Sequence, residues 1–210
     1  MDLPVTLPEK LYLLALDPER GRPTHATDLD LALRAAALTE LLRRKLIRDD
    51  GRHPAPVDGA TDGLDPLSAA LLEQIRQGRR RTWKSWIGRQ RGSVRMVRDG
   101  LAAAGRIRVE EHRLLGLFPV ARVTLPEPRV RKALTAGVES ALSGPFSRVD
   151  PADAALVALV DAARLGSVLA WRRRREHRAR IDKLAPAAGP VPRALRRAVT
   201  ARHADGGGAV

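Results

Sequence analysis

The stretch Leu29–Ile47, LDLALRAAALTELLRRKLI, predicts a helix that is apolar nearly all round until Arg43. Thr27 and Asp28, just before it, offer an N-cap. A helix that presents apolar side chains in every direction is typically buried. We therefore expect this segment to be helical to about Ile47 and to lie near the centre of the core.

Other helical patterns flank this central segment along the chain. They cover Leu7–Leu16, Leu67–Gln77, Ser93–Ala104, Pro128–Leu142, Pro151–Arg180 with a break near Gly166, and Val191–His203. Residues 49–66 hold three prolines, three glycines and five aspartates, which predicts an exposed loop. Residues 107–125 place β-branched and apolar residues around an EEHR turn, which predicts a hairpin. The fold class is therefore expected to be mainly α, with one β-hairpin.

The composition narrows the class of partner. Lys and Arg total 38 against 24 Asp and Glu, which gives a formal net charge of +14. A strongly cationic surface attracts anionic partners, and nucleic acid and acidic membranes are the two abundant polyanions. Cysteine is absent, and we find neither a signal segment nor an apolar run of about 20 residues. We therefore expect a cytosolic protein that is soluble or peripheral to a membrane.

Sequence motifs of catalysis are missing. The chain contains no P-loop, no Gly-x-Gly-x-x-Gly and no Gly-x-Ser-x-Gly. Its five histidines are scattered singly, without the spacing of a zinc site on a helix. The acidic residues cluster only in the 49–65 loop, where turn formation explains them. We therefore expect no enzymatic activity, no catalytic residues, no bound metal and no cofactor.

The segment 79–91, RRRTWKSWIGRQR, combines six basic residues with two tryptophans and no acid. Arg91, Arg95 and Arg98 follow helical spacing from the amino-terminal end of the helix predicted after Gly92. A phosphate bound there would relieve their unfavourable interaction with the helix dipole and would meet free backbone N–H groups. The alternative is a solvated basic surface.

The two tryptophans of this segment have different expected positions, and Arg34, the only basic residue between Arg22 and Arg43, allows two interpretations. Trp86 is expected in the core, whereas Trp83 is equally compatible with the core and with a membrane-interface anchor. Arg34 either pairs with Asp30 one turn earlier or is held at the edge of the core for a phosphate. The arginine run 172–175 is expected to be a solvated helix face.

Four ordered segments resemble the Golgi phosphoprotein 3 family in its shorter bacterial form. They are LPEKLYLLALDPERGRP, LDLALRAAALTELLRRKLI, GLAAAGRIRVEEHRLLGLFP and ALVALVDAARLGSVL, and the match runs from about Leu7 to about Leu184. The resemblance implies a single compact helical domain with one protruding β-hairpin over residues 1–184. A C-terminal helix and a disordered tail would then occupy residues 185–210.

The resemblance also implies a lipid site, because eukaryotic members bind phosphatidylinositol 4-phosphate through a tryptophan and several arginines. Two of the family's arginines fall on Arg34 and Arg91, a third falls on Val94 beside Arg95, and the tryptophan falls on His25. The predicted headgroup site is therefore Arg34, Arg91, Arg95 and His25, with a rim of Arg81, Trp83, Lys84 and Arg98. The family hairpin implicated in self-association corresponds here to Leu115, Leu117 and Phe118.

The sequence thus predicts a non-enzymatic protein on the cytoplasmic face of a membrane, which it binds through acidic, phosphoinositide-type headgroups. The apolar hairpin arm could serve plain packing, homo-oligomer formation or membrane insertion, and we rank these roles in that order. The alternative is a winged-helix DNA-binding protein that uses the helix and hairpin of residues 93–125. Because the hairpin arm LLGLFPV is apolar where a DNA-binding wing should be basic, we rank nucleic acid below the lipid surface.

Overall fold

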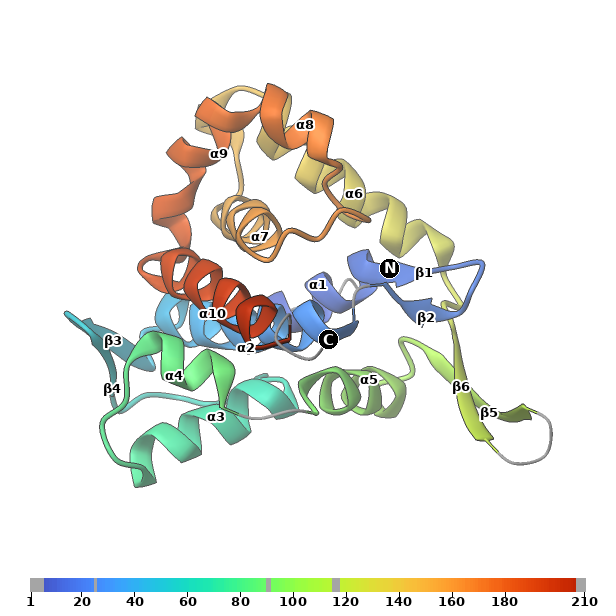
Figure 1. Ribbon diagram of the computed structural model, residues 1–210, viewed down its shortest axis with the longest axis horizontal. Coiled ribbons are helices and arrows are strands. Elements are labelled where there is room, and N and C mark those ends of the chain that lie inside the picture. Colours follow the sequence, from blue (N-terminus) through green and yellow to red (C-terminus); the bar gives the residue numbers. More distant parts are fainter. Residues whose placement is uncertain (1–5, 25, 90–91, 115–117, 207–210) are drawn as a thin grey trace.

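The computed structural model of the protein describes residues 6–24, 26–89, 92–114 and 118–206, and these are mainly helical (Figure 1). The helices are α1 (Leu7–Ala15), α2 (Ala26–Arg43), α3 (Pro66–Gln77), α4 (Trp83–Gly88), α5 (Ser93–Ala103), α6 (Pro128–Ser143), α7 (Pro151–Ala162), α8 (Trp171–Glu176), α9 (Arg178–Leu184) and α10 (Val191–Gly206). Short 3₁₀ turns cover Phe146–Arg148 and Ala185–Ala188. The predicted mainly α fold class is confirmed.

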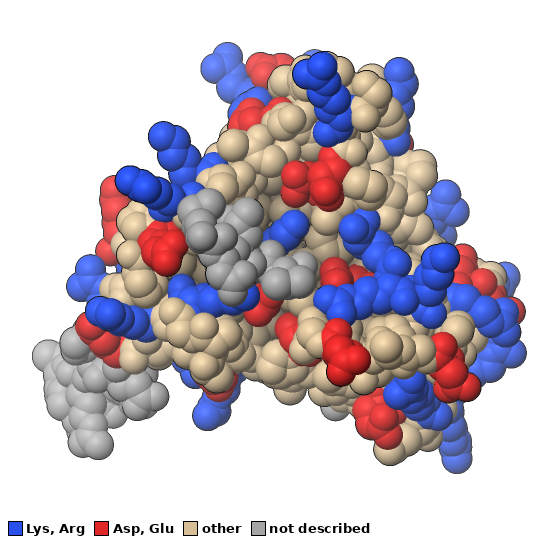
Figure 2. Space-filling model, turned by 180° about the vertical axis from the view of Figure 1, so that it is seen from behind, with Lys and Arg blue, Asp and Glu red and all other residues tan. Residues whose placement is uncertain are grey.

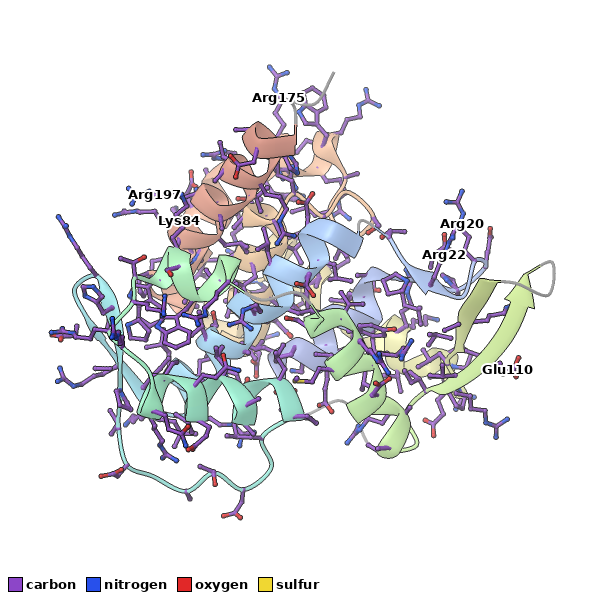
Figure 3. All side chains as sticks on the ribbon, turned by 60° about the horizontal axis from the view of Figure 1, so that its bottom comes forward. Arg20, Arg22, Lys84, Glu110, Arg175 and Arg197 are labelled. Atoms are coloured by element: carbon purple, nitrogen blue, oxygen red, sulfur yellow. The ribbon has the colours of Figure 1, made fainter. Side chains whose placement is uncertain are left out.

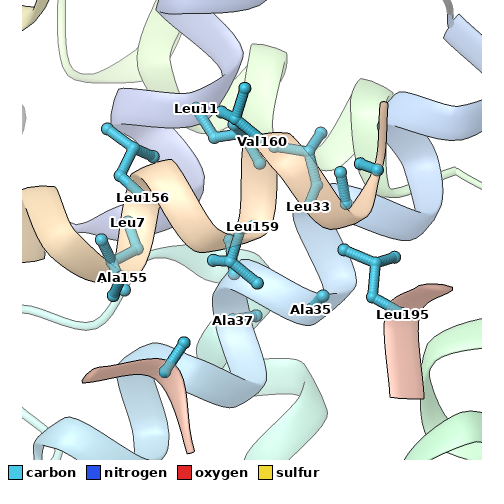
Figure 4. Close-up of a cluster of buried hydrophobic side chains, with 14 of the residues drawn as sticks. Leu7, Leu11, Leu33, Ala35, Ala37, Ala155, Leu156, Leu159, Val160 and Leu195 are labelled. Atoms are coloured by element: carbon cyan, nitrogen blue, oxygen red, sulfur yellow. The ribbon is translucent and has the colours of Figure 1, made fainter. Parts of the chain in front are cut away.

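Helix α2 lies at the centre, as its sequence predicts. It packs against α1, α3, α4, α5, α7 and α10, and nearly all its side chains from Leu29 to Leu41 are buried. Figure 4 shows the side chains of α1, α7 and α10 meeting those of α2 in one apolar cluster. Burial of such side chains stabilises the fold by about 25 cal/mol for each Å² of apolar surface removed from water.

The end of α2 was predicted about four residues too late. The helix stops at Arg43, because Lys45 adopts a left-handed conformation (φ 58°). Its N–H donates to Leu42 O at 3.0 Å, and the Leu46 N–H donates to Leu41 O at 2.9 Å, a Schellman cap. Glycine usually occupies this position. Because it is lysine here, the sequence did not indicate the end of the helix.

The segment after α7 uses the same device. Arg164 is left-handed (φ 54°), its N–H donates to Asp161 O at 3.1 Å, and the Leu165 N–H donates to Val160 O at 3.2 Å. The long helix predicted over Pro151–Arg180 is therefore three helices, α7, α8 and α9. The break begins before Gly166, near which it was expected. By contrast, α5 ends in a Schellman cap at Gly105, close to the prediction.

The described residues contain three small antiparallel sheets, not one. Strands β1 (Leu16–Asp17) and β2 (Arg22–Pro23) form the first, and β3 (Ile47–Asp50) and β4 (His53–Pro56) form the second. Most of the β3–β4 pair lies in the predicted 49–66 loop, and β3 begins two residues before it. Gly51, the first residue of its two-residue turn, has a positive φ (73°), and the Arg52 N–H donates to Asp50 O at 2.9 Å, the hydrogen bond of a γ-turn. The prolines at alternate positions of β4 argued against a strand in the sequence analysis. A two-stranded ribbon tolerates them, because both of its strands are edge strands.

The predicted hairpin is present as β5 (Arg108–Leu114) and β6 (Phe118–Thr124), and it extends from one end of the molecule in Figure 1. Its base is fixed by the β1–β2 turn, where the Val123 N–H donates to Gly21 O at 2.6 Å. Gly21 has a positive φ (61°), and a side chain there would meet Arg122 Cγ at 2.5 Å. Leu115 and Leu117 lie outside the described residues, as does the side chain of Phe118.

Helix α10 belongs to the same hydrophobic core. Val191, Leu195 and Val199 are buried in one cluster with residues of α1, α2 and α7. The core therefore continues beyond residue 184, where the sequence analysis placed the end of the main domain. Helix α10 continues to Gly206, whereas the sequence predicted that this helix ends at His203.

Candidate anion-binding site

A pocket of about 540 Å³ opens at the amino-terminal end of α5, between α1, β2, β6 and α10. Its polar lining consists of three arginines, one aspartate and one tyrosine. These are Arg95, Arg98, Arg202, Asp30 and Tyr12. We call this the α5 pocket. It brings together two residues of the predicted site, Arg95 and Arg98, with an arginine from a helix far away in the sequence.

Asp30 occupies the backbone donors that were expected to bind phosphate. Its Oδ1 accepts hydrogen bonds from the Gly92 N–H at 3.1 Å and the Val94 N–H at 3.2 Å. Gly92, at the N-cap, has a φ of 103°, which side chains rarely adopt. The carboxylate thus complements the helix dipole from within the protein, and these two N–H groups are not free for an external anion.

Arg95 and Arg98 remain at the surface of α5. The Arg95 side chain is 80% exposed and lies 3.5 Å from Asp99 Oδ2. Arg98 is more enclosed and donates to Asp99 Oδ1 from Nε at 2.8 Å and from Nη2 at 2.7 Å. Asp99 is half-exposed, so a ligand phosphate can compete with it for both arginines at little cost.

Arg34 is a core residue and not one at the edge of the core. Only 2% of it is exposed, and its Nε–H donates to Trp86 O at 2.8 Å, which ties α2 to α4. Burial lowers the pKa of the Arg34 guanidinium, while the Asp30 carboxylate counteracts this and Arg89 adds to it. Arg34 is absent from the lining of the α5 pocket. Its position therefore indicates a structural role.

Tyr12 forms part of the pocket wall but is itself buried. Burial raises its pKa to about 12, an effect that Arg98 opposes and Asp99 reinforces. The phenol therefore stays neutral at physiological pH and adds no negative charge to the pocket.

The segment 79–91 does not form the rim of the pocket in the way expected. Trp83 and Trp86 are each only 4% exposed, so both are core residues, and Trp83 is not an interface anchor. The Trp83 indole N–H donates to Asp49 Oδ1 at 2.9 Å. Lys84 is exposed on α4 (Figure 3), and Arg81 is partly buried, but neither lines the α5 pocket.

Two residues of the predicted headgroup site, His25 and Arg91, lie outside the described residues. The residues that sequence reasoning missed are Arg202 and the helix-capping Asp30. Nothing in the sequence around Arg202 indicates a binding site, because only the packing of α10 brings this residue close to α5. The sequence shows an aspartate near the start of α2. It does not show that this aspartate is buried or that it caps α5.

Charge is distributed over the surface and not gathered into one basic patch on the face shown in Figure 2, where acidic residues lie among the lysines and arginines. No described helix has both the length and the apolarity to span a membrane. Within the described ranges, no group of three or more His, Asp or Glu side chains is arranged to hold a metal ion.

Helices packed around an apolar central helix, with a hairpin at one end and an arginine-lined pocket beside it, define a small, mainly α-helical protein. The chain belongs to the Golgi phosphoprotein 3 (GPP34) family, whose sequence profile it matches over residues 7–202. This match covers nearly the whole chain and includes most of α10. No individual curated protein matches the chain.

Proposed function

We propose that this protein is a non-enzymatic, peripheral membrane protein that binds anionic, phosphoinositide-type lipid headgroups at the α5 pocket. Its place would be the cytoplasmic face of a membrane. Membership of the GPP34 family fits a lipid-binding role at this coarse level. The observation that carries the finer proposal is the convergence of Arg95, Arg98 and Arg202 on one pocket.

Guanidinium groups, and not backbone N–H groups, would bind the phosphate in this proposal. Asp30 already accepts from the Gly92 and Val94 N–H groups, so these two donors are not available to a ligand, and the arginine side chains supply the charged donors of the pocket. Arginine is suited to this task, because its planar fork donates two parallel hydrogen bonds to one phosphate. Homo-oligomer formation through the β5–β6 hairpin remains a prediction.

The test is flotation of the protein with phosphatidylcholine vesicles that contain about 5% phosphatidylinositol 4-phosphate, a fraction low enough to limit nonspecific charge attraction. Replacing both Arg95 and Arg98 by Gln should reduce binding about tenfold or more, since each charge-assisted hydrogen bond contributes about 1.5–3 kcal/mol. The matched control replaces Arg48 and Arg52, exposed on the β3–β4 ribbon, and removes the same charge.

Equal losses in the two variants would contradict a specific site and would indicate diffuse attraction. The DNA-binding alternative is tested with the same proteins. Duplex DNA that displaces the vesicles at physiological salt, with an affinity that falls steeply as salt rises, would favour that alternative over the lipid site.

A further inference from the structure

A second arginine-lined cavity, of about 600 Å³, lies between the end of α7, the start of α8, α9 and α10. We call it the α7–α10 pocket. Its charged and aromatic lining consists of Asp161, Arg164, Trp171, Arg174, Arg178 and Arg196. It shares no lining residue with the α5 pocket. Its volume is in the range of pockets that hold small molecules.

The positive charge of this cavity exceeds what its one carboxylate can balance. Asp161 is buried, with 5% of its side chain exposed, and it serves two arginines at once. Arg196 Nη2 donates to its Oδ2 at 2.9 Å, and Arg174 Nε lies 3.0 Å from its Oδ1. Arg178 pairs with Asp182 at 3.2 Å, but both side chains are more than half exposed, so this pair is weak.

Arg174 has donors left over inside the protein. Its side chain is 17% exposed, and neither its Nε nor its Nη2 forms a hydrogen bond to any residue that the structure describes. The Nε–H lies near Asp161 but is not aligned with the carboxylate oxygen. A buried guanidinium donor is strongly favoured to find an acceptor, and an anion in the cavity would supply one.

Arg164 occupies a backbone position that suits glycine. Its left-handed conformation caps α7, as described above, yet its long charged side chain lines the cavity. Its guanidinium therefore adds a further positive charge to the cavity from a backbone position that is unfavourable for a residue other than glycine.

Trp171 adds an apolar surface beside these charges. It is 66% exposed, and the Arg175 guanidinium lies 5.8 Å from the centre of its ring. Figure 3 shows Arg175 at the outer end of this region, away from Lys84 on α4. An indole face next to several guanidinium groups suits a ligand that carries both a phosphate and an apolar or planar portion.

We propose that the α7–α10 pocket binds a phosphate monoester. Arg164, Arg174 and Arg178 contact the phosphate, and the remainder of the ligand packs on Trp171. This chemistry occurs both in soluble phosphate esters and in lipid headgroups with a terminal phosphate. The proposal is independent of lipid binding at the α5 pocket.

The test uses the full chain and two probes: phenyl phosphate in solution, and phosphatidylcholine vesicles that contain phosphatidic acid, with phosphatidylglycerol as the diester comparison. Binding of phenyl phosphate is followed by acrylamide quenching. Trp171 is the exposed tryptophan of the three in the chain, since Trp83 and Trp86 are buried. Bound phenyl phosphate should therefore protect the quenchable fluorescence.

The variant combines Arg164→Gly with Arg178→Gln, two exposed positions that leave the Asp161 pairs intact. Lys45→Gly is the matched backbone control, because Lys45 has the same left-handed conformation at the end of α2. We expect affinity to fall about tenfold or more in the variant and to be unchanged in the control. The melting temperature, measured on each protein, establishes that the variant is folded.

The outcomes separate the two sources of phosphate. If the variant binds phenyl phosphate more weakly than the parent, the ligand type is a soluble ester. If only its binding to phosphatidic acid vesicles is weaker, the ligand type is a lipid headgroup. The Arg95→Gln, Arg98→Gln protein should retain phenyl phosphate binding, so failure at the α5 pocket is distinguishable from failure here. Parent and variant that bind both probes equally, or a parent that binds neither, would overturn the proposal.

Discussion

Two segments of this chain combine tryptophan with a run of arginines, and the structure uses them in opposite ways. In residues 79–91 the tryptophans are buried, and neither Arg81 nor Lys84 lines either arginine-lined pocket. In residues 171–180 the tryptophan is exposed, while Arg174 and Arg178 line a cavity over Asp161. The density of positive charge is similar in both, so it does not decide which segment can hold an anion.

The carboxylate beside each segment accounts for the difference. Asp49, on β3, accepts the indole N–H of Trp83 and helps to keep that ring inside. Asp161, on α7, pairs instead with arginines of α8 and α10 and draws them over one cavity. A basic segment therefore becomes a candidate site when an acid from another helix orients its side chains.

The largest effect on stability should come from removing the Asp161 carboxylate, which pairs with arginines in and beside residues 171–180. Asp161→Ala leaves Arg174 and Arg196 without their shared partner, so we expect the free energy of unfolding to fall by about 3 kcal/mol. Urea denaturation measures this. Asp182→Ala, which removes only an exposed pair with Arg178, should change it by less than about 0.5 kcal/mol. Similar values for the two would show that Asp161 does not organise this region.

The first segment depends on a buried arginine beneath it. Arg34→Lys removes the Nε–H that donates to Trp86 O, and we expect a loss of about 2 kcal/mol in the free energy of unfolding. Vesicle binding per folded molecule should not change, because Arg34 does not line the α5 pocket. Weaker vesicle binding with unchanged stability would restore Arg34 to the headgroup site.

The tryptophans can be compared directly. Trp83→Phe keeps an aromatic ring in the core but leaves the Asp49 carboxylate without the indole donor, so we expect a loss of about 1 kcal/mol in stability. Trp171→Phe removes no buried contact of comparable size and should be close to neutral. Thermal unfolding followed by circular dichroism distinguishes them. Equal destabilisation would mean that Trp171 is packed more tightly than its exposure indicates.

The smallest effect concerns the two left-handed helix caps. Lys45→Gly and Arg164→Gly should each stabilise the protein by up to about 1 kcal/mol, because glycine adopts positive φ without steric cost. The gain is reduced by the greater entropy of glycine in the unfolded chain. A rise in melting temperature for both is the expected result. Destabilisation by Arg164→Gly alone would show that its side chain holds the fold together.

Much of the fold was predictable, since α2 is apolar on every side and α5 ends at a glycine. The errors occurred where a left-handed residue was not glycine, at Lys45 and Arg164, and where prolines masked the β3–β4 ribbon. The residues of the candidate site were harder to predict from the sequence than the fold was. Arg95 and Arg98 were found through helical spacing, but Arg202 reaches the same pocket only because α10 packs against α2 and α4.

The sequence by itself determined that this protein is helical, cationic and organised around one apolar helix, because hydrophobic periodicity and charge are properties of residues in order. Only the tertiary structure decided which charges are buried, paired or gathered at a cavity. Arg34 looked like a phosphate ligand and is a core residue, whereas the run 172–175 looked solvated and in part lines a pocket. Such roles depend on acids such as Asp30 and Asp161, which reach their partners only when distant helices pack together.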